Sequence, residues 1–491
     1  MAPRDWIVAA AYLAGVVALG LWLGRKQQGA SDYFLGKHQL PWWAVLVSVV
    51  ATETSALTVI SIPGIGYLGD LTFLQLALGY CVGRALVAWL LLPRYFDGEV
   101  QTAYQVLGAR WGDGARRASS AVFMVTRAIA TCVRLFAGAI PLAVITGWSY
   151  PASILAVGAA TLLYTFVGGI RSVVWVDVVQ WSVYIVAGIA ALLVATHLLP
   201  GALHLAAEAG KMRVLDFGIS LTRPYAFGTA VIGGAMLSAA SHGTDHLIVQ
   251  RLLATRSLRD ARRALVGSGV VVLLEFTLFL TVGAAIWVVG AVPHTTAGDS
   301  VFPTFVATHL RGGLGGLAVA GILAAAMGST ASALNSLASA TTHDYYAPLS
   351  GRTDDRHLLT MGRLFTVAWA ALLVGGALLF RQRDTPVVVV ALSIASLTYG
   401  ALLGVFILAR VRRVRERDAI LALLLGSALM ALVVFSARLA PLLGDPWLLV
   451  LASRLAWPWY VPMGTALTVA IGVGASCVPG AASRPPAEAP A

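Results

Sequence analysis

Residues able to bind a cation gather within one apolar stretch of the chain, residues 48–67. Glu53 lies near its middle, followed by Thr54, Ser55 and Thr58. A carboxylate at the centre of a membrane span costs at least about 2.5 to 3.5 kcal/mol, so it needs a partner or a water-filled cavity. Hydroxylated residues weaken helical preference and can bond freed carbonyls, so a helix can open here and expose its backbone oxygens. The pattern predicts an ion site, and the alternative is that Glu53 is a protonated structural residue.

Two arginines interrupt a later apolar stretch. Arg127 and Arg134 are seven residues apart, which places them nearly on one helical face. Guanidiniums inside hydrocarbon require anions. They could pair with Glu53, Glu275 or Asp177, or one of them could hold a solute carboxylate in the bidentate manner that arginine favours. The role of Glu275 stays open between an ion-pair partner and a site for a proton or a solute amine.

A third apolar stretch contains Gln75 and Arg84. Arg84 lies close enough to an end of the predicted helix to extend its side chain to the interface. Gln75 is a candidate solute contact, and a hydrogen bond between helices is its alternative role.

The elements that hold these residues are predicted to be membrane spans. Of the 491 residues 58% are hydrophobic and 11% charged, and the mean hydropathy is +0.82, far from the composition of a soluble domain. Because a span needs roughly 20 apolar residues, we predict an all-α integral membrane protein. It has a single transmembrane domain over residues 1–478 with about 13 transmembrane helices, at about 5–24, 41–62, 72–92, 119–147, 152–169, 174–199, 226–250, 264–291, 313–345, 358–380, 386–409, 418–441 and 458–478.

Lysine and arginine are distributed unevenly between alternate loops. Of the 34 in the chain, 21 fall on one side of the predicted membrane and nine on the other. By the positive-inside rule the N-terminus is outside and the C-terminus inside, in a cytoplasmic membrane. The net charge of +12 therefore reflects topology, and no basic soluble domain suggests a nucleic-acid partner. The basic loop 251–263 is expected to contact the phosphates of membrane lipid.

The chain ends carry no further functional signal. The first span is expected to stay in the mature protein, because its positive flank at Arg25 follows the apolar run instead of preceding it. Residues 479–491 are rich in proline and alanine, and we expect them to be disordered. Cys81, Cys132 and Cys477 have neither disulfide nor metal-ligand spacing.

Four runs of sequence resemble one family of transporters. They are DYFLGKHQLPWWAVLVSVVATETSALTVISIPGIGY (32–67), YTFVGGIRSVVWVDVVQ (164–180), GTDHLIVQRLLATRSLRDARRAL (243–265) and AAAMGSTASALNSLASATTHDYY (324–346). In this order the runs resemble the sodium/solute symporter family, over about residues 30–410. The resemblance implies the LeuT-like fold, with two inverted five-helix repeats at about 41–199 and 226–409. The first helix of each repeat would be interrupted, and peripheral helices at 5–24, 418–441 and 458–478 would complete the fold.

The resemblance also implies a sodium site. Ala51 and Thr54 would supply carbonyls from the first interrupted helix, while Ala325 would supply a carbonyl and Ser329 a hydroxyl. Members of the family usually have two adjacent hydroxyl residues here, whereas this chain has Gly328 before Ser329. The missing oxygen leaves two possibilities for Glu53. It strengthens a sodium site, or a proton replaces sodium, since an isolated buried carboxyl has a raised pKa.

Other site residues follow from the same resemblance. Asp177 lies on the family's sodium path, although here it could instead pair with Arg171 at the start of its helix. A second sodium site of the sialic-acid type looks incomplete, so we expect one coupling ion. Solute contacts are expected from Ser55, Thr58, Gln75, Arg127, Arg134, Ser238 and Ser241. Because Ser238, Ser241 and Val272 stand where the sugar transporters use asparagine, tyrosine and lysine, a sugar-binding pattern is absent.

We therefore predict a secondary active transporter that carries a cation, with sodium favoured, and a small organic solute by alternating access. The two arginines at 127 and 134 weakly favour a solute bearing a carboxylate. Proton-coupled symport through Glu53 is one alternative, and a solute sensor with the same fold is another. A sensor of this kind generally appends a signalling domain, and none is expected here. No sequence motif of an intramembrane enzyme is present.

Overall fold

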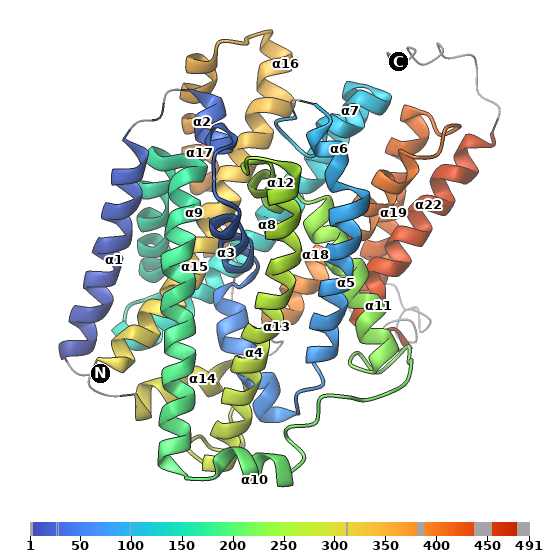
Figure 1. Ribbon diagram of the computed structural model, residues 1–491. Coiled ribbons are helices and arrows are strands. Elements are labelled where there is room, and N and C mark those ends of the chain that lie inside the picture. Colours follow the sequence, from blue (N-terminus) through green and yellow to red (C-terminus); the bar gives the residue numbers. More distant parts are fainter. Residues whose placement is uncertain are drawn as a thin grey trace.

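The computed structural model describes residues 3–25, 27, 29–98, 100–310, 313–380, 387–436 and 454–478. Every named element among them is a helix (Figure 1). The predicted tail at 479–491 lies outside the described residues. The helices are α1 (Pro3–Gly24), α2 (Ala30–Leu35), α3 (Trp42–Glu53), α4 (Ala56–Leu68), α5 (Leu74–Leu90), α6 (Leu92–Phe96), α7 (Gln105–Trp111), α8 (Asp113–Thr146), α9 (Tyr150–Leu198), α10 (Ala202–Glu208), α11 (Phe227–Gly243), α12 (His246–Leu253), α13 (Leu258–Val289), α14 (Gly298–His309), α15 (Leu314–Ala340), α16 (Ala347–Ser350), α17 (Asp355–Leu378), α18 (Val387–Leu408), α19 (Glu416–Val434) and α22 (Tyr460–Ser476).

Within the described residues, seven helices are long and apolar enough to cross a membrane, or eight if the bent pair α3 and α4 is one span. One of the seven, α9, has 49 residues and is too long for a single crossing. It is interrupted at Gly169, whose φ of 52° and ψ of −154° are not helical. The spans predicted at 152–169 and 174–199 are therefore the two halves of this kinked helix. With several further apolar helices, the chain is a multi-pass membrane protein.

Two helices are broken near the centre of the molecule. Between α3 and α4, Thr54 and Ser55 have extended backbone conformations, and the axes of the two segments differ by 64°. Between α11 and α12, the break falls at Thr244 and Asp245. The first pair descends from α3 to α4 in Figure 1, whereas the second rises from α11 to α12. The two broken helices thus run in opposite directions, as inverted repeats require.

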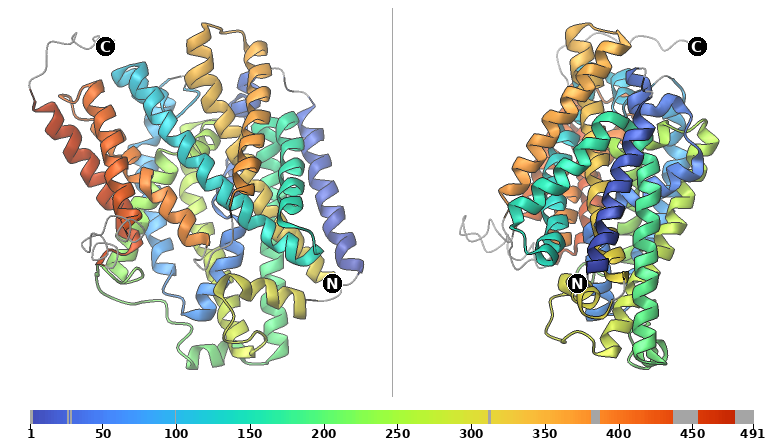
Figure 2. Two further views of the ribbon diagram at one scale, coloured as in Figure 1. Left: turned by 180° about the vertical axis from the view of Figure 1, so that it is seen from behind. Right: turned by 90° about the vertical axis from the view of Figure 1, so that its left-hand side faces the viewer.

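Helix α15 is the most deeply buried of the long helices among the described residues. In the span that begins with it, 94% of the most apolar segment is buried inside the protein. It packs against α9, α8, α1, α3 and α4. Figure 2 shows α1 on one flank of the bundle, with α19 and α22 together on the opposite flank. Small residues along α15 let its neighbours approach closely: a Cβ on Gly316 would lie 2.2 Å from the carbonyl oxygen of Asp5 in α1.

Candidate ion and solute site

The four predicted sodium ligands are all buried, on either side of the contact between α3 and α15: Ala51 (2% exposed), Thr54 (0%), Ala325 (1%) and Ser329 (3%). The hydroxyls of Thr52 and Ser332, 3.1 Å apart, join the two helices beside them. Ser329 Oγ donates to the carbonyl oxygens of Ala325 at 3.1 Å and Ala326 at 3.2 Å, which leaves its lone pairs free for a cation. Hydroxyl and carbonyl oxygens are the hard ligands that such a cation prefers.

The structure explains why a glycine, Gly328, precedes Ser329. A Cβ on Gly328 would lie 2.5 Å from Oε1 of Gln180 and 3.1 Å from Oδ1 of Asp177. The space of the missing hydroxyl residue is thus already filled by two oxygen-bearing side chains of α9. Both of these oxygens are buried and have no hydrogen-bond partner among the described residues.

Glu53 is paired with an arginine that we expected to reach the interface. Arg84 is fully buried, and its guanidinium forms an ion pair with Glu53 and donates to Ser268 Oγ at 2.6 Å. The expectation for Arg84 was wrong, because the site of Glu53 on α3 lies against the middle of α5. His242 Nε2 lies 3.7 Å from the same carboxylate. Glu53 is therefore not an isolated carboxyl, and the reason for suspecting proton coupling through it is removed.

Glu275 is held by hydrogen bonds. Thr54 Oγ1 donates to one carboxylate oxygen at 2.5 Å, and Trp181 Nε1 donates to the other at 3.2 Å. No arginine pairs with Glu275 among the described residues, so the ion-pair alternative for Glu275 is not the one found there. The bond from Thr54 ties α13 to the break between α3 and α4.

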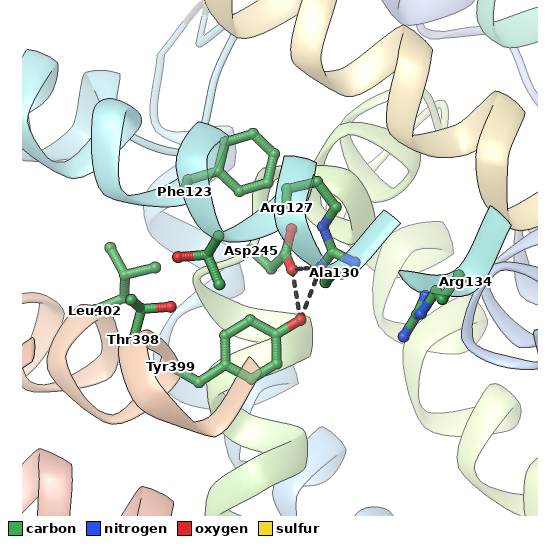
Figure 3. A pocket seen from close by; sticks show the side chains of 9 residues that line it. Phe123, Arg127, Ala130, Arg134, Asp245, Thr398, Tyr399 and Leu402 are labelled. Carbon is green, nitrogen blue, oxygen red and sulfur yellow. Dashed lines mark hydrogen bonds and ion pairs between the residues drawn. The ribbon is translucent and has the colours of Figure 1, made fainter. Parts of the chain in front are cut away.

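Arg127 also has an unexpected partner. Its guanidinium forms an ion pair with Asp245 and donates to the hydroxyl of Tyr399 at 2.7 Å (Figure 3). Tyr399 in turn donates to Asp245 Oδ2 at 2.7 Å. The other oxygen of Asp245 accepts from the backbone N–H of Leu247 at 2.9 Å and caps α12. The ion-pair alternative for Arg127 is therefore the one found, but its acid is Asp245, in the break between α11 and α12, and not Glu53, Glu275 or Asp177.

Arg134 differs from Arg127 in having no ion pair with any described residue. Both arginines line one small cavity of about 10 Å³, and Figure 3 shows Arg134 apart from the bonded group around Asp245. The guanidinium Nε of Arg134 is buried and has no hydrogen-bond partner in the part of the chain that the structure describes. The remaining residues that line the cavity are Phe123, Thr126, Ala130, Asp245, Thr398, Tyr399 and Leu402.

Asp177 pairs with Arg251, not with Arg171. The Arg251 guanidinium lies 3.4 Å from Oδ2 of Asp177 and also donates to Ser332 Oγ. Ser48 Oγ donates to the same aspartate oxygen at 2.5 Å. Arg251 is fully buried, so placing it in a lipid-contacting loop was wrong. The last turn of α12 carries it back into the protein.

The other predicted solute contacts come from α5, from α11 and from the start of α4. The amide of Gln75 is already occupied, because Nε2 donates to the Tyr225 carbonyl at 2.7 Å and Oε1 accepts from the Asp216 N–H at 3.2 Å. Ser241 Oγ lies 2.8 Å from His242 Nδ1. Ser238 is buried, and its hydroxyl has no hydrogen-bond partner among the described residues.

Of the remaining two residues, Ser55 lies in the break between α3 and α4, and Thr58 lies in the first turn of α4. Ser55 immediately precedes α4, and its carbonyl accepts from the N–H of Thr58 at 2.9 Å. Sequence reasoning gave no site role to His242, Gln180 and Tyr399, although all three are polar residues inside predicted spans. That position was the available signal.

The sequence and the fold are similar to those of known proteins. The model of the "Sodium:solute symporter family" matches residues 33–426. The chain belongs to this family. The symporter is 28% identical over 459 residues to a putative sodium-dependent multivitamin transporter of Drosophila melanogaster, covering 89% of this chain and 76% of that one. It is also 28% identical to the sodium/sialic acid symporter NanT of Aliivibrio fischeri, with 86% of each chain covered.

A solved structure shows the same fold. A sodium-coupled sialic acid symporter in a substrate-bound outward-open state superposes with a TM-score of 0.84 at 24% identity, covering 97% of this symporter and 98% of that chain. The LeuT-like architecture expected from the sequence is therefore confirmed. The protein is a sodium-coupled solute symporter and not an enzyme, and Na⁺ is its coupling ion.

Proposed function

We propose that this symporter couples one sodium ion to the uptake of a small organic solute that bears a carboxylate, and that Arg134 binds that carboxylate. The observation that carries the proposal is the lack of an ion-pair partner for Arg134 among the described residues. By contrast, Arg84, Arg127 and Arg251 each pair with an acidic side chain. A buried guanidinium needs an anion, and a bound carboxylate would provide one.

A solute that bears a carboxylate agrees with the solute named for one of the relatives. The Aliivibrio protein is named for sialic acid, which carries a carboxylate. The cavity beside Arg134 opens next to Asp245, at the break of the second repeat. A solute that reaches Arg134 would therefore lie beside a segment whose hydrogen bonds the helix break has already released.

The proposed sodium site consists of the carbonyls of Ala51, Thr54 and Ala325 and the hydroxyl of Ser329. Its support is the burial of all four residues and the helix break at Thr54. The break frees carbonyls at the end of α3, and α15 presents Ser329 on the buried side.

We propose a single coupling ion because the guanidinium of Arg251 is already the positively charged partner of Asp177. Arg251 contacts both Asp177 and Ser332, the two residues that remained for a second sodium site. The guanidinium charge there would repel a second cation, and the guanidinium already contacts Oδ2 of Asp177 and Oγ of Ser332.

The proposed topology has 13 spans, with five in each repeat. Counting the two broken pairs as one span each and the halves of α9 as two gives the repeats 41–199 and 226–409, with α1, α19 and α22 outside them. In Figure 1, α1 begins at the bottom and α22 ends at the top, which supports an odd number of crossings. The N-terminus would lie outside and the C-terminus inside the cytoplasmic membrane.

Uptake into proteoliposomes tests this function. Labelled propionate, lactate, benzoate and glucose are supplied with an inward sodium gradient or with choline. Sodium-dependent uptake of at least one carboxylate, lost in Arg134→Gln and kept in Arg363→Gln, is the expected result. Arg363 is a suitable control because it lies over the rings of Tyr33 and Phe166 and not at the cavity. Sodium-driven uptake of glucose alone would overturn the carboxylate assignment.

A further inference from the structure

The last turn of α5 is capped by arginines from two other parts of the chain. Arg262 of α13 donates from Nε to the carbonyl oxygen of Ala88 at 2.9 Å. Arg410, which follows α18, donates from its guanidinium to the carbonyl oxygen of Leu90. The last carbonyls of a helix have no partner within the helix, so both bonds stabilise the end of α5. A guanidinium has five N–H donors, and one such bond leaves most of them available.

A third arginine lies beside Arg410. Arg94 belongs to α6, which begins two residues after α5 ends. The next residue, Tyr95, packs against Phe406 of α18 with the ring centroids 6.2 Å apart, and Arg410 follows Phe406 by four residues. Partial desolvation and the positive charge of Arg94 both lower the pKa of Arg410. Two like charges are therefore held close together at the end of α5.

None of these three arginines forms an ion pair with a residue that the structure describes. By contrast, Arg116 pairs with Asp113, and Arg417 lies 3.4 Å from a carboxylate oxygen of Asp418. Guanidiniums held together without an acid repel each other, and an anion bound between them would offset that repulsion. Phosphate is a preferred anion of arginine, because its oxygens accept two parallel N–H bonds from one guanidinium.

An apolar surface continues from these arginines along two helices. Trp89 of α5 is 66% exposed, and the guanidinium of Arg262 lies over its ring, 4.6 Å from the centroid. Leu86 is exposed one turn before Trp89. On α13, Val266 and Val270 are exposed four and eight residues after Arg262, on the same helical face. Because α5 and α13 pack against each other, the arginines lie at the polar end of one apolar surface.

We propose that Arg94, Arg262 and Arg410 bind the phosphate of an anionic phospholipid, whose acyl chains lie along the exposed apolar faces of α5 and α13. The free N–H donors of the arginines bond to the phosphate oxygens, and Trp89 contacts the lipid at the level of its head group. A free phosphate would satisfy the arginines but leave the apolar faces uncovered. The site is independent of the proposed carboxylate solute, since it lies at the end of α5 on the outer surface of the bundle.

Native mass spectrometry of the detergent-purified full-length protein tests the site. The affinity for the first bound dioleoylphosphatidylglycerol is compared with that for dioleoylphosphatidylcholine, and glycerol phosphate is added as a soluble competitor. The double variant Arg94→Gln, Arg410→Gln is compared with the matched control Arg352→Gln, Arg356→Gln. Arg352 and Arg356 are exposed and lie between α16 and the first turn of α17, at the same end of the molecule as α6 (Figure 1). Melting temperatures in phosphatidylcholine verify that each variant is folded.

Phosphatidylglycerol should bind the wild type and the control variant alike, and the Arg94→Gln, Arg410→Gln variant about 25-fold more weakly. Arg94→Gln alone should bind it about fivefold more weakly. This single variant serves if the double variant does not fold, because the Arg94 side chain has no hydrogen bond with a described residue.

Three results would each overturn the proposal. Equal losses in the two double variants would show only a general attraction to the charge of this face. Equal binding of phosphatidylcholine and phosphatidylglycerol would show that the arginines do not select an anionic head group. Displacement of the lipid by an equal concentration of glycerol phosphate would identify a soluble organic phosphate as the ligand.

Discussion

The guanidinium of Arg251 and the carboxylate of Asp177 lie 3.4 Å apart, and both side chains are completely buried. The pair joins α12 to the second half of α9. Ser48 of α3 donates to Asp177 and accepts from Arg251, and Ser332 of α15 accepts from Arg251. One ion pair therefore links four helices beside the proposed sodium site, and breaking it should affect stability and coupling together.

Removal of either member of this pair should be strongly destabilising. Asp177→Asn leaves the Arg251 charge buried and unpaired, which costs about 3 to 5 kcal/mol. The double variant Asp177→Asn, Arg251→Gln should be more stable than the sum of the single effects predicts, and melting temperatures of all three variants measure this coupling. Additive losses would show that the two charges do not interact in the protein.

Restoring a side chain at Gly328 should be harmful unless space is made for it. Gly328→Ala places a methyl group about where Gln180 Oε1 approaches, and overpacking of this kind costs about 1 to 3 kcal/mol. Gly328→Ala combined with Gln180→Ala should recover most of the melting temperature. A fully stable single variant would show that Gln180 does not occupy this space.

Substitution of Thr54 should separate the roles of its hydroxyl and its carbonyl. Thr54→Val removes the donor to Glu275 and should lower the melting temperature, by about 1 to 3 kcal/mol in free energy of unfolding. The proposed sodium ligand is the backbone carbonyl, so the rise in melting temperature caused by sodium should persist. Thr54→Ser is the matched control and should behave like the wild type. Loss of the sodium effect in Thr54→Val alone would make the hydroxyl a ligand.

The start of α15 depends on a residue of α1. Asp5 accepts hydrogen bonds from the backbone N–H groups of Gly313 at 3.0 Å and Gly316 at 3.2 Å. Loss of such a helix cap costs about 0.5 to 2 kcal/mol, so Asp5→Ala should lower the melting temperature. Asp5→Asn keeps an accepting oxygen and should lower it less. Identical melting temperatures for the two variants would argue against a capping role.

The sequence was informative where the signal is local. Hydroxylated residues around Glu53 indicated the break at Thr54, because helix weakening depends on neighbouring residues. Partners could not be predicted in this way. Arg127 and Asp245 are 118 residues apart, and their contact depends on how α8 packs beside the second broken helix. Arg251 is a second example. Its place at the edge of a basic loop suggested contact with lipid, whereas the last turn of α12 buries it inside the protein.

The space around Gly328 shows a second limit of sequence reasoning. A missing hydroxyl suggested a weakened ion site, but the side chains that fill the space come from α9, more than a hundred residues earlier. Only tertiary packing places Gln180 there. Similarly, Arg84 seemed near a helix end, and its burial follows from the approach of α3 to α5 through Glu53.

The central claim is that sodium binds between the first broken helix and α15, and thermal unfolding of the purified protein in sodium against choline tests it most directly. Wild type should melt at a higher temperature in sodium, and so should the control Ser336→Ala. Ser336 lies seven residues further along the same helix, and within the described residues its hydroxyl bonds to the Ala333 carbonyl alone. Ser329→Ala should lose that sodium-specific rise while melting normally in choline. A full sodium effect in Ser329→Ala would contradict the assignment and place the ion elsewhere in the protein.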